Sequence, residues 1–312
     1  MLAPAPKVSI IVVSYNTRDM TLDCLRSVQA ETRLTYELIV VDNASTDGSV
    51  EAIAAEFPGI TFMAETDNHG FAKANNIAAD RATGEYILLL NPDTVVLDGA
   101  IDKLVAFAEA RPDAGVWGGR TLYGDRSLNP TSCWRRMSLW NTFCLAAGLT
   151  AIFRNSPLFN SQAYAGWDRS SERQVDIVTG CFLLIRRKDW DVLQGFNLSF
   201  LMYGEDADLC LRAARELNAA PYMTPEATII HYGGASEKVR SDKMVRLLNA
   251  KIELTKHHIP GWQRPIVQRL FRLWPLTRAL VFSLLRPSGD SARAWKDIWQ
   301  RRAEWRYGFS GR

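Results

Sequence analysis

The chain has 312 residues and a net charge of +3, with 47% hydrophobic and 23% charged residues, as expected for a globular protein of one or two domains. Its five cysteines are scattered without a Cys-x-x-Cys pair, which argues against a disulfide framework or a zinc site and favours reduced thiols in the cytoplasm. We expect no signal peptide, and the longest apolar stretches, 143–153 and 273–285, are too short to span a bilayer.

The first half of the sequence alternates strands and helices. Residues 7–14 and 37–41 are short β-branched apolar runs typical of buried strands, and amphipathic helices are expected over 20–29, with Thr17 as N-cap, and over 50–57. Two βα units in succession predict a parallel, doubly wound sheet. The turn after the first strand contains no glycine, which argues against a dinucleotide fingerprint, and no P-loop is present.

Polar side chains follow the second strand. Asp42 stands at its end and faces the loop after Ser14, where its carboxylate could accept the N3–H of uracil or thymine. Alternatively, Asp42 caps the following helix, although Ser45 is better placed for that role.

A third strand over 60–64 leads into a helix that begins at Gly70. The first-turn N–H groups of this helix, together with Lys73, could receive a phosphate or sugar oxygen. Asn75 and Asn76 are poor helix formers, which indicates that at least one of them makes a polar contact, although a solvated face is also compatible with the pair.

The most informative stretch is the apolar run 86–90, which predicts a strand buried on both faces and ends in Asn91-Pro92-Asp93. Proline cannot continue the ladder, so Asp93 is held just beyond the carboxyl end of a central strand, where α/β sheets bind ligands. Asp93 and Asn91 offer half of an oxygen shell for a divalent cation that also binds substrate phosphates. The alternative is an ordinary Asn-Pro-Asp turn.

Beyond this strand a helix over 97–110 and a strand over 115–119 are expected. Periodicity is then lost over 121–174, and a stretch of this length without clear elements suggests an acceptor-binding or lid region. Residues 175–186 predict one strong strand.

A second group of reactive side chains lies at a predicted helix start. Glu205, Asp206 and Asp208 follow an aromatic and apolar approach, and a partly buried carboxylate suits a general base. The alternative is a charged first turn that favours the helix dipole. His231 ends a strand before two glycines and could bind a metal ion or phosphate, or be structural.

The C-terminal quarter is basic. Residues 238–312 hold 17 Lys and Arg against 5 Asp and Glu, a surplus of 12, whereas the remaining residues hold 20 against 29, a deficit of 9. This quarter also carries five tryptophans, at 262, 274, 295, 299 and 305. Such a combination suits an anionic membrane surface, and tryptophans in a small core under a solvated face fit equally well. No nucleic-acid motif accompanies the charge, so nucleic acid is not an expected partner.

In this order, the segments VSIIVVSYN, IVVDNASTDGS, DNHGFAKANN, GEYILLLNPDT, VDIVTGCFLLIRR, FLMYGEDADLCLR and HYGGAS resemble the family 2 glycosyltransferases, most closely their bacterial rhamnosyltransferase-like branch. The resemblance covers about three quarters of the chain. It implies an inverting enzyme with the GT-A fold, and it implies that Asn91-Pro92-Asp93 replaces the metal-binding DxD motif, with Asp93 as the direct ligand of Mn²⁺ or Mg²⁺ and His231 assisting.

The resemblance also implies that Glu205-Asp206 is the ED motif, with Asp206 as the catalytic base. The nucleotide-binding residues would be Ser14, Tyr15, Asn16, Asp42, Asn43, Gly70, Phe71, Asn75 and Asn91. We therefore expect a doubly wound GT-A domain over 1–237, with a nucleotide-binding half (1–120) and an acceptor and catalytic half (121–237), and a helical extension over 238–312.

The implied function is sugar transfer from a nucleotide-sugar donor to a polyprenyl-linked or growing polysaccharide acceptor. The resemblance to the rhamnosyltransferase-like branch implies that the donor is dTDP-L-rhamnose. We expect a cytoplasmic enzyme, with the basic extension as a candidate contact to the inner face of the plasma membrane. The alternatives are a UDP-hexose donor within the same family, or a sugar nucleotidyltransferase, for which the expected glycine-rich loop after the first strand is missing.

Overall fold

The computed structural model describes residues 5–233, 240–285 and 289–309, which form two compact units. We call them the sheet unit (Met1–Trp134, Asp168–Leu198 and Leu209–Ser236) and the helical unit (Arg135–Trp167, Ser199–Asp208 and Glu237–Arg312). The helical unit therefore combines the predicted C-terminal extension with two earlier segments. The domain boundaries given above stay a prediction.

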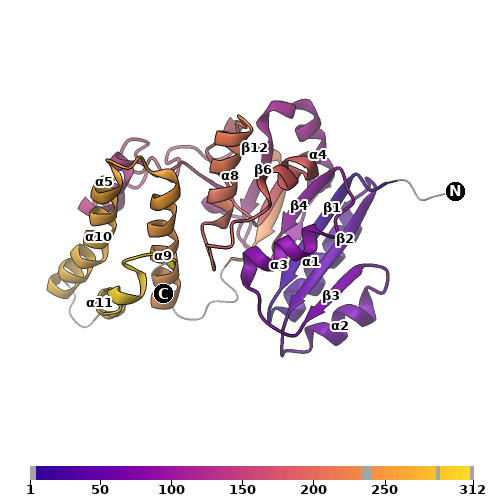
Figure 1. Cartoon of the computed structure of the whole chain (residues 1–312), viewed down its shortest axis with the longest axis horizontal. Coiled ribbons are helices and arrows are strands. Elements are labelled where there is room, and N and C mark those ends of the chain that lie inside the picture. The colour runs from indigo at the N-terminus through magenta and orange to yellow at the C-terminus, as the bar shows by residue number, and fades with distance from the viewer. Residues whose placement is uncertain (1–4, 234–239, 286–288, 310–312) are drawn as a thin grey trace. The chain divides into compact units, whose positions relative to one another are not determined.

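The sheet unit is organised around a mixed sheet with the strand order β3-β2-β1-β4-β11-β6-β12-β5 (Figure 1). The β1–β2, β2–β3, β1–β4 and β6–β12 pairs are parallel, and β11 runs antiparallel to β4 and β6, as β5 does to β12. The predicted doubly wound, mostly parallel sheet is therefore confirmed. These strands are β1 (Val8–Ser14), β2 (Tyr36–Asn43), β3 (Thr61–Glu65), β4 (Tyr86–Leu90), β5 (Thr94–Val96), β6 (Val116–Leu122), β11 (Phe182–Arg186) and β12 (Tyr222–His231).

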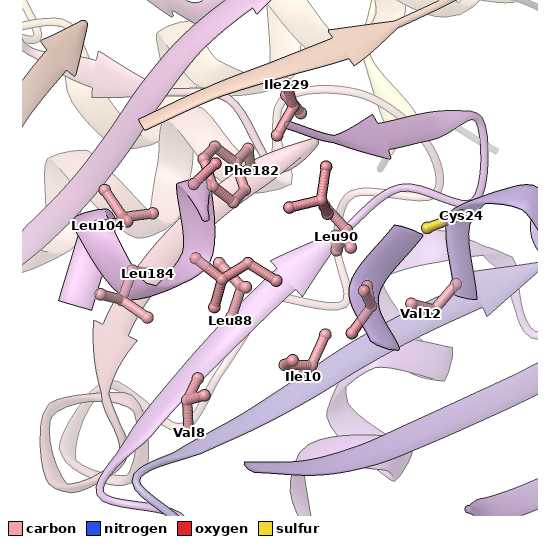
Figure 2. Packing of buried hydrophobic residues seen from close by; sticks show 14 of the residues in the cluster. Val8, Ile10, Val12, Cys24, Leu88, Leu90, Leu104, Phe182, Leu184 and Ile229 are labelled. Carbon is pink, nitrogen blue, oxygen red and sulfur yellow. The ribbon is translucent and has the colours of Figure 1, made fainter. Parts of the chain in front are cut away.

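Helices cover this sheet because its strands are apolar on both faces. Every residue of β1 and of β4 is buried, as the unbroken apolar run 86–90 predicts. Figure 2 shows alternate residues of β1 and β4 packing with Cys24 of α1 and Leu104 of α4. Each fully buried aliphatic side chain there contributes roughly 1.5–3 kcal/mol to stability. The helices of the unit are α1 (Arg18–Glu31), α2 (Ser49–Glu56), α3 (Gly70–Ala79), α4 (Ala100–Ala110), α7 (Arg187–Leu193) and most of α8 (Glu205–Glu216).

Short elements correct two expectations. The stretch 175–186 is not one strand, because β10 (Ile177–Val178) pairs with β8 (Cys133–Trp134) and a turn, in which the Phe182 amide donates to the Thr179 carbonyl, separates it from β11. The region 121–174 is not without elements. It contains η2 (Pro130–Ser132), α5 (Leu139–Ala147), α6 (Leu149–Ile152) and the two-residue strands β7 (Leu128–Asn129), β8 and β9 (Arg173–Gln174), besides η1 (Pro112–Ala114) upstream.

The helical unit contains α5 and α6 together with α9 (Arg240–His258), α10 (Arg264–Leu285), α11 (Asp290–Gln300) and α12 (Arg302–Trp305). Trp274 and Trp295 pack edge to face at 5.4 Å, and the indole N–H of buried Trp305 donates to the Ile298 carbonyl. All three tryptophans are therefore buried within the helical unit, whereas Trp262 is exposed. Among the described helices, none is both long and apolar enough to cross a membrane.

Candidate active site

The pairing of β5 with β12 brings Asp93 and His231 together. His231 lies opposite Thr94 in the register, and the Tyr232 amide donates to the Asp93 carbonyl at 3.0 Å. As a result, His231 Nε2 lies 3.4 Å from Asp93 Oδ1, while the Gly233 amide donates to Asp93 Oδ2 at 3.0 Å. The two predicted metal-binding residues are thus neighbours in space, at the carboxyl end of β4.

Asn91 completes this cluster. Its backbone amide donates to the Cys181 carbonyl, and its Nδ2 lies 3.4 Å from His231 Nε2. The Thr94 hydroxyl donates to the Asn91 carbonyl at 2.7 Å and so stabilises the Asn91-Pro92-Asp93 turn. Cys181, whose thiol interacts with the His231 ring, was not predicted, since nothing local in the sequence indicates that β11 returns beside β4.

The Asp93 carboxyl and the His231 ring shift each other's pKa values in opposite directions. Burial raises the pKa of Asp93, but the His231 ring outweighs it and leaves this pKa below its ordinary value. Burial lowers the pKa of His231, but the Cys181 thiol and the Asp93 carboxylate outweigh it and raise the pKa to about 10. A metal ion would therefore compete with a proton for the imidazole.

The donor atoms of this cluster fit a hard divalent cation. Asn91 Oδ1 and His231 Nδ1 are both buried without a hydrogen-bond partner, and Asp93 supplies a buried carboxylate. Within the part of the chain that the structure describes, no three His, Cys, Asp or Glu side chains gather to hold a metal ion by themselves. A cation here would need substrate oxygens as further ligands, as Mg²⁺ and Mn²⁺ do beside phosphates.

The loops after β1 and β2 are tied to each other. Asn16 adopts a left-handed conformation (φ 53°), its Oδ1 accepts from the Thr46 amide at 2.8 Å, and its own amide donates to Ser45 Oγ. Ser45 therefore does not cap a helix as expected. Ser14 is buried and shares its hydroxyl with Thr17 and Thr21, so Thr17 stands at the N-cap position without a side-chain cap bond.

Asp42 lies at the end of β2, fully buried beside these loops. Its Oδ1 accepts from the Ser45 amide at 2.8 Å, and its Oδ2 has no hydrogen-bond partner. An unsatisfied buried carboxylate oxygen costs free energy, so this atom is poised to accept a ligand N–H or O–H. Tyr15, the remaining predicted residue of this loop, is about half exposed.

Other predicted nucleotide-binding residues are engaged within the protein. Asn43 donates to the Asn68 side chain and to the Gly70 carbonyl, and accepts from the His69 amide. The Gly70 amide donates to Asn68 Oδ1 at 2.9 Å, so this first-turn N–H is already bonded. The Phe71 ring lies 5.9 Å from that of Phe196. These contacts fix the shape of the loop that precedes α3.

The two asparagines of α3 have different partners. Asn75 is buried and its Nδ2 donates to the Phe71 carbonyl one turn earlier. Asn76 donates to the Phe196 carbonyl and accepts from the Phe196 amide, both at 2.9 Å, so it holds the segment after α7 against α3. The expected polar contact of the asparagine pair is therefore made within the protein.

Glu205, Asp206 and Asp208 lie at the start of α8, within the helical unit, in three different environments. Asp208 is buried and its Oδ1 lies 2.7 Å from Nε2 of His258 at the end of α9. Asp206 is partly buried, and its Oδ1 accepts from the Ala207 amide. Glu205 is buried, with Oε2 lacking a hydrogen-bond partner. His258 was not predicted because its partner precedes it by 50 residues.

The burial of Glu205 gives a pH dependence to folding. Burial and the neighbouring Asp206 carboxylate raise the pKa of Glu205 from 4.5 to about 8. Between these values the folded chain keeps a proton that the unfolded chain releases, so the free energy of unfolding falls as pH rises. We expect Glu205→Gln to remove this dependence. The melting temperature of the variant minus that of the parent should therefore increase from pH 5 to pH 8. A constant difference would contradict a raised pKa.

The turn before α8 has little room for a larger residue. Tyr203 and Gly204 both have positive φ, and a Cβ on Gly204 would lie 3.1 Å from the Phe200 ring and 3.3 Å from Ala250 Cβ. We expect Gly204→Ala to lower the free energy of unfolding in urea by about 1–3 kcal/mol. Gly59→Ala is the matched control, since its Cβ would meet nothing within 4 Å. Equal stability of the two variants would contradict this account.

Comparisons with known proteins identify the family and the fold of the chain. The family model "Glycosyl transferase family 2" matches residues 9–192. An N-acetylglucosaminyl-diphospho-decaprenol L-rhamnosyltransferase of Mycobacterium tuberculosis is 25% identical over 82% of this chain and 87% of its own length. The rhamnosyltransferase WbbL of Escherichia coli is 28% identical over 72% of this chain and 83% of its own length. The mannosyltransferase PcManGT of Pyrobaculum calidifontis, solved in complex with GDP-Man and Mn²⁺, shares the fold with a TM-score of 0.58 at 19% identity, over 97% of this chain and 86% of that one. The chain belongs to glycosyltransferase family 2, and its fold is GT-A.

Proposed function

We propose that the chain is a metal-dependent, inverting glycosyltransferase that moves L-rhamnose from dTDP-L-rhamnose to a hydroxyl of a lipid-linked or growing cell-surface polysaccharide. We further propose that it acts in the cytoplasm, at the inner face of the plasma membrane. The observation that carries the proposal is the buried Asp93–His231 pair beside Asn91, with unsatisfied polar atoms, at the carboxyl end of β4. Asp42 lies at the end of β2, two strands away at the same edge of the sheet.

The nucleotide-binding role rests on Asp42. Its free Oδ2 is an acceptor of the kind that the N3–H of thymine or uracil requires, and cytosine lacks that donor. The hydrogen bonds of Asn16 with Ser45 and Thr46 hold the neighbouring loops in place around it. This arrangement supports a thymidine or uridine nucleotide, and the names of the rhamnosyltransferase relatives support rhamnose as the sugar.

Asp93 and His231 would hold the divalent cation, with Asn91 Oδ1 available to it or to the diphosphate. When bound, the cation supplies charge neutralisation for the departing nucleoside diphosphate. Asp206 accepts the proton of the acceptor hydroxyl as the oxygen attacks the anomeric carbon. The carbon–oxygen bond to the diphosphate breaks on the opposite side, so the configuration inverts.

The test is donor hydrolysis and transfer with a panel of sugar nucleotides. We expect release of dTDP from dTDP-L-rhamnose with Mn²⁺ or Mg²⁺, little release from UDP-hexoses or GDP-mannose, and none with EDTA. No nucleoside diphosphate from any donor would contradict the proposal. Formation of pyrophosphate from a nucleoside triphosphate and a sugar 1-phosphate would replace it with a nucleotidyltransferase.

A further inference from the structure

Two helices of the helical unit leave large apolar side chains in solvent. On α10, Ile266, Leu273 and Leu280 recur at seven-residue intervals, and Leu284, which is 83% exposed, continues the same stripe. Most apolar side chains of a stable helix are covered, so a stripe of this length indicates a surface that meets a partner.

The short helices α5 and α6 add to this surface. They expose Trp140, Phe143 and Ile152, the last being 70% exposed. The helices α5 and α10 lie side by side (Figure 1), and the Thr277 hydroxyl donates to the Ala146 carbonyl at 3.2 Å. We call the exposed apolar residues of α5, α6 and α10 the apolar face of the helical unit.

The chain segments that form this face contain basic residues and no acidic ones. The sequence contains no Asp or Glu between Asp125 and Asp168, the stretch that holds α5 and α6, and none between Glu253 and Asp290, the stretch that holds α10. The same two stretches carry cationic side chains, at residues 126, 135, 136, 154, 256, 264, 269, 272, 278 and 286. Apolar residues with cations and no acids are the combination that binds anionic lipid.

A second copy of the chain suits the face less well. Helices that pair through a seven-residue repeat usually place opposite charges beside the seam. The α10 helix offers only arginines, so two copies would bring like charges together. The core tryptophans Trp274, Trp295 and Trp305 are buried and therefore cannot be the membrane anchors that the sequence composition suggested.

We propose that α5, α6 and α10 form a docking face for an anionic phospholipid bilayer, with the leucines of α10 entering the interface and the arginines contacting headgroup phosphates. This inference rests on the proposed function in one respect: docking would let the enzyme reach a lipid-linked acceptor in the bilayer. The docking itself requires neither donor nor metal.

The experiment is cosedimentation of the full chain with vesicles of phosphatidylglycerol and phosphatidylcholine, or of phosphatidylcholine alone. We expect binding to the first vesicles only. The variant Leu280→Gln with Leu284→Gln should bind at least about tenfold more weakly, because two leucines no longer enter the interface. The matched control is Val192→Gln with Leu198→Gln, which changes two exposed apolar residues of the sheet unit and should bind as the parent does.

A second variant tests the charge. Arg154→Gln with Arg269→Gln changes two exposed cations and should weaken binding to anionic vesicles at low salt, since each contributes attraction to the surface. Equal binding to both vesicle types, or unchanged binding of the Leu280→Gln, Leu284→Gln variant, would overturn the proposal. A dimer in sedimentation velocity that this variant converts to a monomer, without vesicle binding by the parent, would overturn it in favour of a second copy.

Donor hydrolysis without vesicles separates this inference from the proposed function. The parent and the Leu280→Gln, Leu284→Gln variant should hydrolyse donor at the same rate, because neither leucine belongs to the candidate active site. Loss of vesicle binding with intact hydrolysis supports the docking face. Vesicle binding without any hydrolysis would leave the face standing and overturn the glycosyltransferase proposal alone.

Discussion

Replacing Asp206 with asparagine is expected to abolish sugar transfer while donor binding persists. The amide is nearly isosteric with the carboxylate but cannot accept the proton of the acceptor hydroxyl, and loss of a general base typically costs about 10²–10⁴-fold in rate. Asparagine keeps an oxygen for the bond from the Ala207 amide, so the start of α8 should stay folded. Transfer rates measured beside donor affinity by calorimetry check this prediction.

Glu216→Gln is the control for this variant. Glu216 is an exposed carboxylate near the other end of the same helix, where it forms an ion pair with its neighbour Arg215. Its loss should leave both rate and affinity unchanged. If donor affinity of Asp206→Asn falls in step with turnover, Asp206 has a structural role and the proposed base must be sought elsewhere.

Replacing Asp93 with alanine should weaken metal-dependent donor binding by at least about 100-fold, because the change removes the only carboxylate of the cluster. The measurement is a Mn²⁺ titration of donor binding, together with binding of the nucleotide in EDTA. We expect the EDTA value to change little, since the Asp42 loop is untouched.

Asp113→Ala provides the comparison, since Asp113 is an exposed carboxylate of the sheet unit in η1, away from β4 and β12 in the sequence. A Mn²⁺ titration of Asp93→Ala that matches the parent would remove Asp93 from the metal site. A thermal melt of both variants shows whether the lost bond to the Gly233 amide affects folding.

The local pattern of apolar residues was sufficient to predict β1, β2 and β4, the strands whose ends carry residues of the candidate site. The run 86–90 is apolar at every position, and such an unbroken run is typical of a strand that is covered on both faces. In the structure, every residue of β4 is buried. The helix starts at Gly70 and Glu205 were also predictable, because each follows a break in periodicity with suitable polar residues. The polar residues at the strand ends then mark the edge where β1, β2 and β4 finish.

The contacts between distant segments could not be predicted in the same way. The neighbourhood of Asp93 and His231 depends on the antiparallel return of β5 beside β12, and no residue near either one encodes that pairing. The break inside 175–186 was missed because β10 and β11 are both apolar and differ only in their partners. The hydrogen bonds between the Asn76 side chain and the Phe196 backbone likewise join segments that are far apart in the sequence.

The hydrogen bond between Asp208 and His258 bears on how this protein can be shortened. A chain trimmed before His258 would lose the hydrogen bond between the buried Asp208 carboxylate and the His258 ring, and loss of a hydrogen bond to a buried polar group typically costs about 1–3 kcal/mol. The C-terminal helices are thus not a detachable appendage. A minimal enzyme obtained by truncation should therefore be less stable than the parent, for reasons unrelated to membranes.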